Sequence, residues 1–144
     1  MLSKDFKEFI ALLNKHDVKY LVVGGYAVAI HGYPRYTKDL DVWIALSPGN
    51  ADKMLMVLND FGFGELELTA EDFTKSDQII QLGYPPNRID IITSLTGINF
   101  NESYENRLVI DLGDIEVLVI DRDNLKKNKL ATGRLQDLAD AENI

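Results

Sequence analysis

The apolar positions near the start of the chain follow the period of a helix. They recur at i, i+3, i+4 and i+7 and predict an amphipathic helix that Ser3 caps and that runs to about Lys15. Its stripe consists of Phe6, Phe9, Ile10 and Leu13. Residues 19–23 are short, aromatic and β-branched, which indicates a buried strand. Residues 39–45 alternate polar and apolar side chains, so we expect a strand with two different faces.

The same patterns extend along the rest of the chain. Ser47 and Pro48 predict a helix start, and Thr69 with Asp72 predicts a short capped turn. Further helices are expected at 25–31, 48–59, 100–106 and 135–142, and Asp121 is expected to cap a helix that contains the cluster of Lys and Arg residues near the C-terminus. Further strands are expected at 77–83, 88–93, 107–112 and 115–120. This order predicts an α/β (α+β) domain with one central mixed sheet of about 4–6 strands flanked by helices. Strands 77–83 and 88–93 are joined too tightly for a parallel crossover, so they should be antiparallel, and Gly113-Asp114 marks a hairpin.

Candidate chemistry begins where the first strand ends. Gly24 and Gly25 let the backbone turn and expose N–H groups, and a helix that starts there favours an anion. On the next strand Asp39 and Asp41 share one face with Trp43, because side chains alternate along a strand. Two carboxylates roughly 7 Å apart repel each other unless a cation lies between them. Their hard oxygen atoms suit Mg²⁺.

A third aspartate, Asp90, stands in the middle of the predicted apolar strand 88–93. Aspartate is depleted in strands, so its presence there favours a metal-facing role. Three alternatives stay open. In the first, Asp90 forms a purely structural ion pair with Arg88. In the second, Asp39 and Asp41 are solvated residues on the polar face of an edge strand. In the third, the glycine pair forms a tight turn that binds no ligand.

These residues together resemble a known family. The run 22–44 (VVGGYAVAIHGYPRYTKDLDVWI), with RIDIIT at 88–93 and NKLATGRLQDLADAE at 128–142, is similar to the nucleotidyltransferase superfamily of the DNA polymerase β fold. Within it the chain resembles the small bacterial branch of minimal nucleotidyltransferases and abortive-infection type toxins. The resemblance spans nearly the whole chain and implies the nucleotidyltransferase fold.

The resemblance also implies roles for single residues. Asp39, Asp41 and Asp90 would be the catalytic, metal-binding carboxylates for two Mg²⁺ ions, with Asp90 as the base that helps to deprotonate the attacking hydroxyl. Gly24 and Gly25 would bind the β- and γ-phosphates of a nucleoside triphosphate (NTP). The stretch around 129–134 would close over the nucleotide through Lys129 and Arg134, with Asp137 as an ion-pair partner of Arg134; a solvated helix is the alternative.

The loop before residue 39 offers further phosphate contacts. Arg35, Thr37 and Lys38 supply two cations and a hydroxyl there, although an exposed polar loop without a ligand accounts for them equally well. Trp43 could stack on a base, but packing is the favoured interpretation. His16 and His31 have no neighbours at metal-ligand spacing and are interpreted as structural.

Composition narrows the class of protein. At 144 residues, with 46% hydrophobic and 26% charged residues, the chain is expected to form a single domain over 1–144. It has no cysteine, which excludes disulfides and thiolate metal sites. Net charge −8 argues against duplex DNA as a partner, but five of the 15 Lys and Arg residues cluster near the C-terminus: Arg122, Lys126, Lys127, Lys129 and Arg134. This cluster fits an NTP, or an RNA end. The N-terminus has no signal-peptide or membrane-span pattern, so we expect no membrane contact and a cytoplasmic location.

The sequence therefore leads to an expected function. It is a Mg²⁺-dependent nucleotidyltransferase that moves a nucleoside monophosphate from an NTP to a hydroxyl of a protein, a tRNA or a small molecule, as part of a toxin–antitoxin or phage-defence pair. The alternative is a catalytically inactive nucleotide- or protein-binding module of such a pair. Because the chain has no separate acceptor-recognition domain, a partner protein or a homo-oligomer is expected to supply part of the site.

Overall fold

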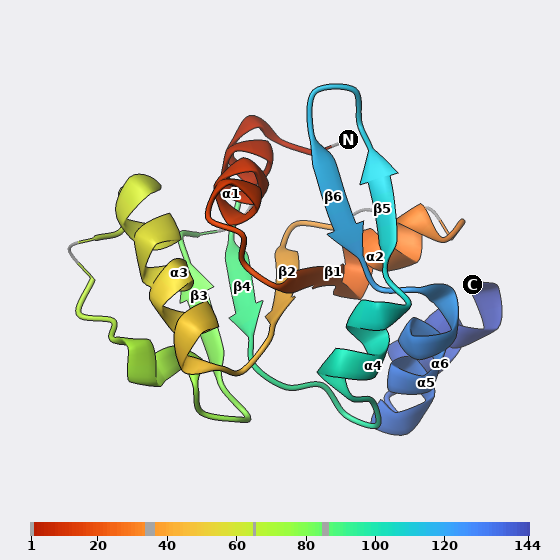
Figure 1. The fold of residues 1–144 in the computed structure, drawn as a ribbon. Helices are drawn as coiled ribbons and strands as arrows, with labels where there is room; N and C mark the ends of the chain where they lie inside the picture. Colours follow the sequence, from red (N-terminus) through yellow and green to blue (C-terminus); the bar gives the residue numbers. More distant parts are fainter. Residues whose placement is uncertain (1, 34–36, 65, 85–86) are drawn as a thin grey trace.

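A mixed sheet runs through the centre of the molecule (Figure 1). The computed structural model describes residues 2–33, 37–64, 66–84 and 87–144, and among these residues the sheet has six strands in the order β3-β4-β2-β1-β6-β5. The strands are β1 (Tyr20–Val23), β2 (Leu40–Ile44), β3 (Ile79–Leu82), β4 (Ile89–Ile92), β5 (Leu108–Asp111) and β6 (Glu116–Val119). The helices are α1 (Lys4–Lys15), α2 (Gly24–Ile30), α3 (Pro48–Asp60), the short 3₁₀ helix η1 (Ala70–Phe73), α4 (Phe100–Glu105), α5 (Arg122–Thr132) and α6 (Leu135–Asn143).

The strand pairings confirm the predicted mixed sheet. β2 pairs in parallel with β4 and antiparallel with β1, and β1 pairs in parallel with β6. The expected antiparallel pair β3–β4 and the β5–β6 hairpin are both present. β2 therefore lies inside the sheet, between β4 and β1, and the interpretation of Asp39 and Asp41 as residues of an edge strand is wrong.

Side-chain caps fix where the helices begin. Ser3, Ser47 and Asp121 each accept a hydrogen bond from the backbone N–H three residues later, as the sequence predicts. Thr69 and Asp72 form the expected capping box at η1. Most strands are one or two residues shorter than predicted, because backbone pairing ends before the alternating pattern does. Asp39, for example, directly precedes β2.

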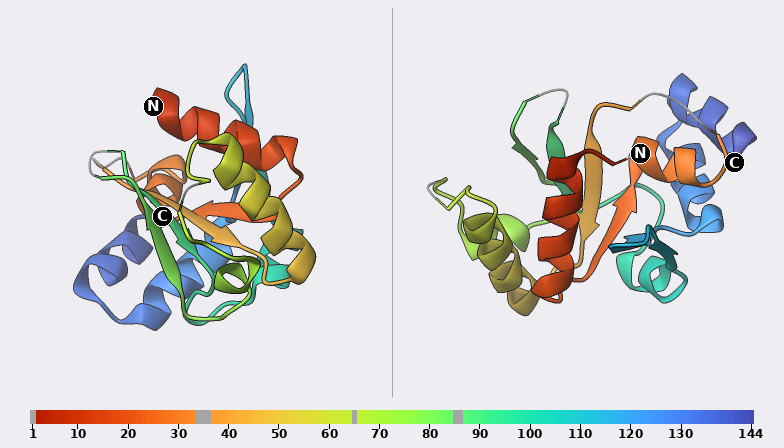
Figure 2. Two further views of the ribbon diagram at one scale, coloured as in Figure 1. Left: turned by 90° about the vertical axis from the view of Figure 1, so that its left-hand side faces the viewer. Right: turned by 90° about the horizontal axis from the view of Figure 1, so that it is seen from above.

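The two faces of the sheet carry different helices (Figure 2). Tyr20 and Ile44 are paired neighbours on the face that α1 covers, where the Tyr20 hydroxyl donates to Asn14 Oδ1 at 2.9 Å. Leu40 and Val42 complete this buried face. The opposite face of β2 carries Asp41 and looks toward α5 and α6. None of the described helices is long and apolar enough to cross a membrane.

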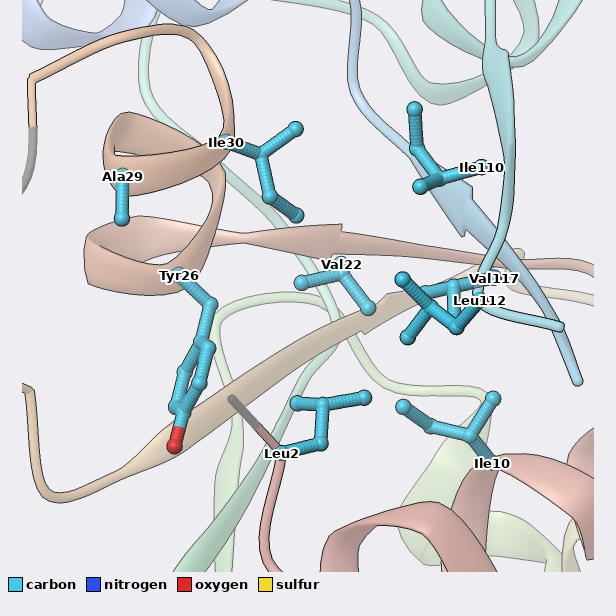
Figure 3. A pocket seen from close by; sticks show the side chains of 9 residues that line it. All are labelled: Leu2, Ile10, Val22, Tyr26, Ala29, Ile30, Ile110, Leu112 and Val117. Atoms are coloured by element: carbon cyan, nitrogen blue, oxygen red, sulfur yellow. The ribbon is translucent and has the colours of Figure 1, made fainter.

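An apolar pocket of about 330 Å³ lies between α1, α2 and the β5–β6 hairpin (Figure 3). Its side chains come from Leu2, Ile10, Val22, Tyr26, Ala29, Ile30, Ile110, Leu112 and Val117. The Tyr26 hydroxyl is the single polar side-chain atom among them. A phosphate or a metal ion needs polar partners, so this pocket does not suit a nucleotide.

The spare volume gives a stability prediction. Val117→Ile adds one methylene to a wall of this pocket and should raise the free energy of unfolding by up to about 0.8 kcal/mol. Val119→Ile is the matched control on the same strand. Val119 is fully buried and does not line the pocket, so the added methylene should cost about 1–3 kcal/mol through overpacking. Urea denaturation of both variants measures the difference, and equal effects would contradict it.

Candidate active site

The register of the sheet brings two of the predicted carboxylates side by side. Asp41 on β2 is directly paired with Asp90 on β4. On the other side of β2, Asp41 is paired with Val23, the last residue of β1. Paired residues project to the same face of a sheet, so Asp41 and Asp90 lie on one face beside the start of α2.

Gly24 lies directly against the Asp41 carboxylate. Its φ of +64° lies in the left-handed region, and a Cβ added there would overlap with Asp41 Oδ2. Glycine is therefore required twice, for the backbone conformation and for the close approach. The glycine turn and the acidic face, which are 17 positions apart in the sequence, form one site.

Arg88 joins Asp39 to Asp90. Its Nε donates to Asp90 Oδ1 at 2.9 Å and its Nη2 to Asp90 Oδ2 at 3.1 Å. The same Nη2 donates to Asp39 Oδ2 at 2.8 Å. The ion pair between Arg88 and Asp90 that was open as a structural alternative thus exists, and it holds Asp39 in the group as well. The other oxygen of Asp39, Oδ1, is buried without a hydrogen-bond partner among the described residues.

The site carries more negative than positive charge. Burial, together with the negative charges of Asp90 and Asp39, raises the pKa of Asp41 to about 7. Lys129 and Arg88 act in the opposite direction without cancelling this effect. An Asp with a pKa near neutrality marks a position that would accept a cation.

The donors present fit Mg²⁺ bound together with a ligand better than a metal cage made of protein alone. Within the described residues, no three acidic or histidine side chains are grouped so that they could hold a metal ion. However, Mg²⁺ is usually held by one or two carboxylates plus substrate phosphates. Asp39, with its unpartnered Oδ1, and Asp41, with its raised pKa, offer two carboxylates of this kind.

The raised pKa of Asp41 predicts how stability changes with pH. In the unfolded chain an Asp titrates near about pH 3.9. Between that pH and about pH 7 the folded protein binds more protons than the unfolded chain. The free energy of unfolding of the metal-free protein therefore falls as the pH rises through this window and then levels off. Asp41→Asn keeps the shape without the charge, so it should be more stable than wild type by about 1–2 kcal/mol at pH 8 and not at pH 4. Denaturation in EDTA at both pH values tests this, and equal differences at the two would contradict it.

A pocket of about 290 Å³ opens from Asp41 toward α5 and α6. Val23, Gly24 and Asp41 form its sheet side. Its opposite wall consists of polar and charged side chains from the two C-terminal helices and the turn between them: Asn128, Lys129, Thr132, Arg134 and Asp137. The two sequence regions that carry the predicted chemistry therefore face each other across one cavity.

Lys129 is held by a buried ionic network. It is only 6% exposed, and its Nζ lies 3.0 Å from Asp137 Oδ1 and 3.3 Å from Asp140 Oδ2. The interpretation of Lys129 as a solvated helix residue is therefore wrong. Asp137 also accepts hydrogen bonds from Thr132 Oγ1 and, at 2.9 Å, from Arg134 Nε. Burial alone would raise the pKa of Asp137, but the hydrogen bonds from Thr132 and Lys129 lower it below its ordinary value.

Among the predicted residues that the structure describes, Gly25, Asp39 and Asp90 are not part of the lining of this cavity. Arg35 is outside the described residues. Thr37 Oγ1 donates to the Asp39 carbonyl at 3.4 Å and Lys38 is exposed, and neither is among the described residues that line the pocket. Trp43 is 2% exposed and packs edge-to-face on Phe100, so it is a core residue rather than a base-stacking platform.

Both histidines have structural contacts. His16 Nε2 lies 2.7 Å from Asp60 Oδ2, and His31 Nε2 lies 2.7 Å from the Ile120 carbonyl oxygen. The sequence interpretation missed two contacts of the site: the bond from Arg88 to Asp39, and the approach of Asp140 to Lys129. Asp137 and Asp140 are three residues apart on a helix, so they share a face, and this spacing beside a basic helix was a usable signal.

Comparisons with known proteins agree with this geometry. Residues 2–144 match a family described as "Nucleotidyltransferase of unknown function (DUF6036)". A crystal structure of a candidate nucleotidyltransferase from Thermotoga maritima is similar with a TM-score of 0.65 and 12% sequence identity, over 93% of this chain and 86% of that one. No curated protein matches the sequence. At this identity the structural likeness shows the fold, and the predicted nucleotidyltransferase fold is confirmed.

Proposed function

Because this chain belongs to the family of nucleotidyltransferases of unknown function, DUF6036, we propose that it is an active enzyme that moves a nucleoside monophosphate from an NTP to a hydroxyl of an acceptor and releases pyrophosphate. One observation carries the proposal. Asp41 lies against Gly24 and is paired with Asp90, to which Arg88 joins Asp39, and Asp41 lines a pocket that Lys129 and Arg134 also line. Acidic groups for a cation and basic groups for phosphates thus face each other.

Asp39 and Asp41 are the proposed ligands of Mg²⁺. When bound, Mg²⁺ would neutralise charge on the triphosphate and lower the pKa of the attacking hydroxyl. Asp90, which is paired with Asp41 in the parallel register, would accept the proton of that hydroxyl. Arg88 orients the Asp90 carboxylate through two hydrogen bonds.

The polyphosphate would lie between the glycine turn and the C-terminal helices. Backbone N–H groups of Gly24 and Gly25 supply neutral donors on one side, and Lys129 supplies a fixed positive charge on the other. The side chain of Arg134 is 77% exposed. It would therefore turn toward a phosphate while the buried Lys129 stays fixed. Most of the catalytic effect would then come from positioning and charge neutralisation, without a covalent enzyme intermediate.

The finer parts of the proposal concern the acceptor and the setting. We propose a hydroxyl of a protein, a tRNA or a small molecule as acceptor, and a cytoplasmic toxin–antitoxin or phage-defence pair as the context. The cavity is small, and a partner protein or a second copy of the chain would complete acceptor recognition. Net charge −8 argues against duplex DNA as the substrate.

A second candidate function rests on Arg88. Its guanidinium already pairs with Asp39 and Asp90. Among the described residues, no three acidic or histidine side chains are grouped so that they could hold a metal ion. This arrangement favours an inactive module that binds a nucleotide or a protein. The two candidates differ in whether any label leaves the nucleotide.

The deciding experiment follows two positions of one label. The protein is incubated with each NTP, labelled at either the α- or the γ-phosphate, in cell lysate with Mg²⁺ or with EDTA. Transfer of the α label alone, only with Mg²⁺, supports the transferase, and sensitivity of the product to protease or ribonuclease then gives the class of acceptor. Nucleotide binding without transfer supports the module, and transfer of the γ label would indicate a kinase instead.

A further inference from the structure

Arg88 brings positive charge to two of the three carboxylates in the acidic cluster of Asp39, Asp41 and Asp90. It makes three hydrogen bonds of 2.8–3.1 Å to two different carboxylates, one before β2 and one on β4. The guanidinium is a planar fork whose donors can bind both carboxylates at once, which an ammonium group cannot do in the same way. The side chain is only 27% exposed, so water replaces few of these bonds.

We propose that Arg88 is an internal counter-ion that occupies the acidic site until a divalent cation arrives with a nucleotide. This inference rests on the proposed function, because it assigns a regulatory role at the same site. In the ligand-free protein the guanidinium binds Asp39 Oδ2 and both oxygens of Asp90. A divalent cation that binds Asp39 and Asp41 on its own would meet the positive charge of this guanidinium directly beside Asp39.

A nucleotide changes this balance. Its phosphates add negative charge beside the carboxylates, and a displaced guanidinium can pair with them as well as with Asp90. Arg88 would therefore leave Asp39 at little cost when metal and triphosphate enter together, and at a high cost when metal enters alone. The site would stay closed to free divalent cations and open to the metal–nucleotide complex.

Removal of Arg88 separates this role from a purely structural one. The Arg88→Gln variant keeps a hydrogen-bond donor but loses the charge. Its affinity for Mn²⁺ in the absence of nucleotide should be about tenfold or more higher than that of wild type, because the charged hydrogen bonds of the guanidinium no longer compete with the metal for the carboxylates. Mn²⁺ binding is measured by electron paramagnetic resonance or calorimetry. Arg107→Gln, which removes an exposed arginine stacked on Tyr104, is the matched control and should leave Mn²⁺ affinity unchanged.

The same variant gives a second readout. Without its counter-ion the cluster repels itself, so the melting temperature of Arg88→Gln should be lower than wild type in EDTA and should rise much more than wild type on addition of Mg²⁺. Arg88→Lys retains the charge without the fork and should give intermediate Mn²⁺ affinity, which keeps the test valid if Arg88→Gln does not fold in EDTA. Unchanged or weaker Mn²⁺ binding in the folded variants would overturn the proposal.

These measurements do not depend on catalysis. If the wild-type protein transfers no label but the Arg88 variants bind Mn²⁺ more tightly, the counter-ion role stands and the proposed enzyme function fails. If label is transferred and the variants bind Mn²⁺ no better, the enzyme function stands and the counter-ion role fails.

Discussion

Asp41→Asn is expected to lower nucleotidyl transfer by at least about a thousandfold, a loss of about 4 kcal/mol in transition-state stabilisation. Asp41 lies at the centre of the site, paired with Asp90 on one side and in contact with Gly24 on the other. The amide keeps the shape of the side chain but cannot supply the charge that a divalent cation requires. The initial rate of α-label transfer measures the effect.

The controls exclude unfolding as the cause. Asp41→Asn should be at least as stable as wild type, because the carboxylate it replaces is destabilised by burial and by two neighbouring carboxylates. An inactive variant with undiminished stability is the signature of a functional charge. Asp52→Asn makes the same chemical change on the exposed side of α3 and should retain wild-type activity. An Asp41→Asn enzyme within tenfold of wild type would contradict the assigned role.

Local chemistry made the elements around the site predictable. Ser3, Ser47 and Asp121 cap their helices through bonds that span three residues, so the signal and the structure are close in sequence. The period-2 pattern of residues 39–45 likewise predicted the strand that carries Asp41, although Asp39 directly precedes that strand. The glycine pair also predicted the junction between β1 and α2, because this signal lies in the residues that form the junction.

The remaining contacts depend on which distant residues meet, and local pattern does not encode that. Lys129 lies on a helix with several exposed cations, and its burial follows from the packing of α6, which brings Asp137 and Asp140 against it. The bond from Arg88 to Asp39 requires β2 and β4 to be parallel neighbours. Sequence spacing pointed to the candidate residues, but which of them meet and how their charges balance depends on the fold.

Lys129→Met is expected to cost about 3–5 kcal/mol of unfolding free energy. Its ammonium is the shared partner of Asp137 and Asp140, and all three side chains are buried. Methionine fills a similar volume but removes the ammonium that both buried carboxylates share. Urea denaturation at neutral pH measures the loss, and Lys127→Met, on the exposed face of the same helix, should change stability by less than about 0.5 kcal/mol.

A second substitution distinguishes charge from packing. Adding Asp140→Asn to Lys129→Met removes one of the two carboxylate charges that Lys129 neutralises, while Asp137 keeps its bonds to Arg134 and Thr132. The double variant should therefore be more stable than Lys129→Met alone, and the coupling energy of the cycle gives the strength of the buried pair. Additive losses would mean that Lys129 acts through packing. In that case the position of the Lys129 side chain would be fixed by something other than the two aspartates of α6.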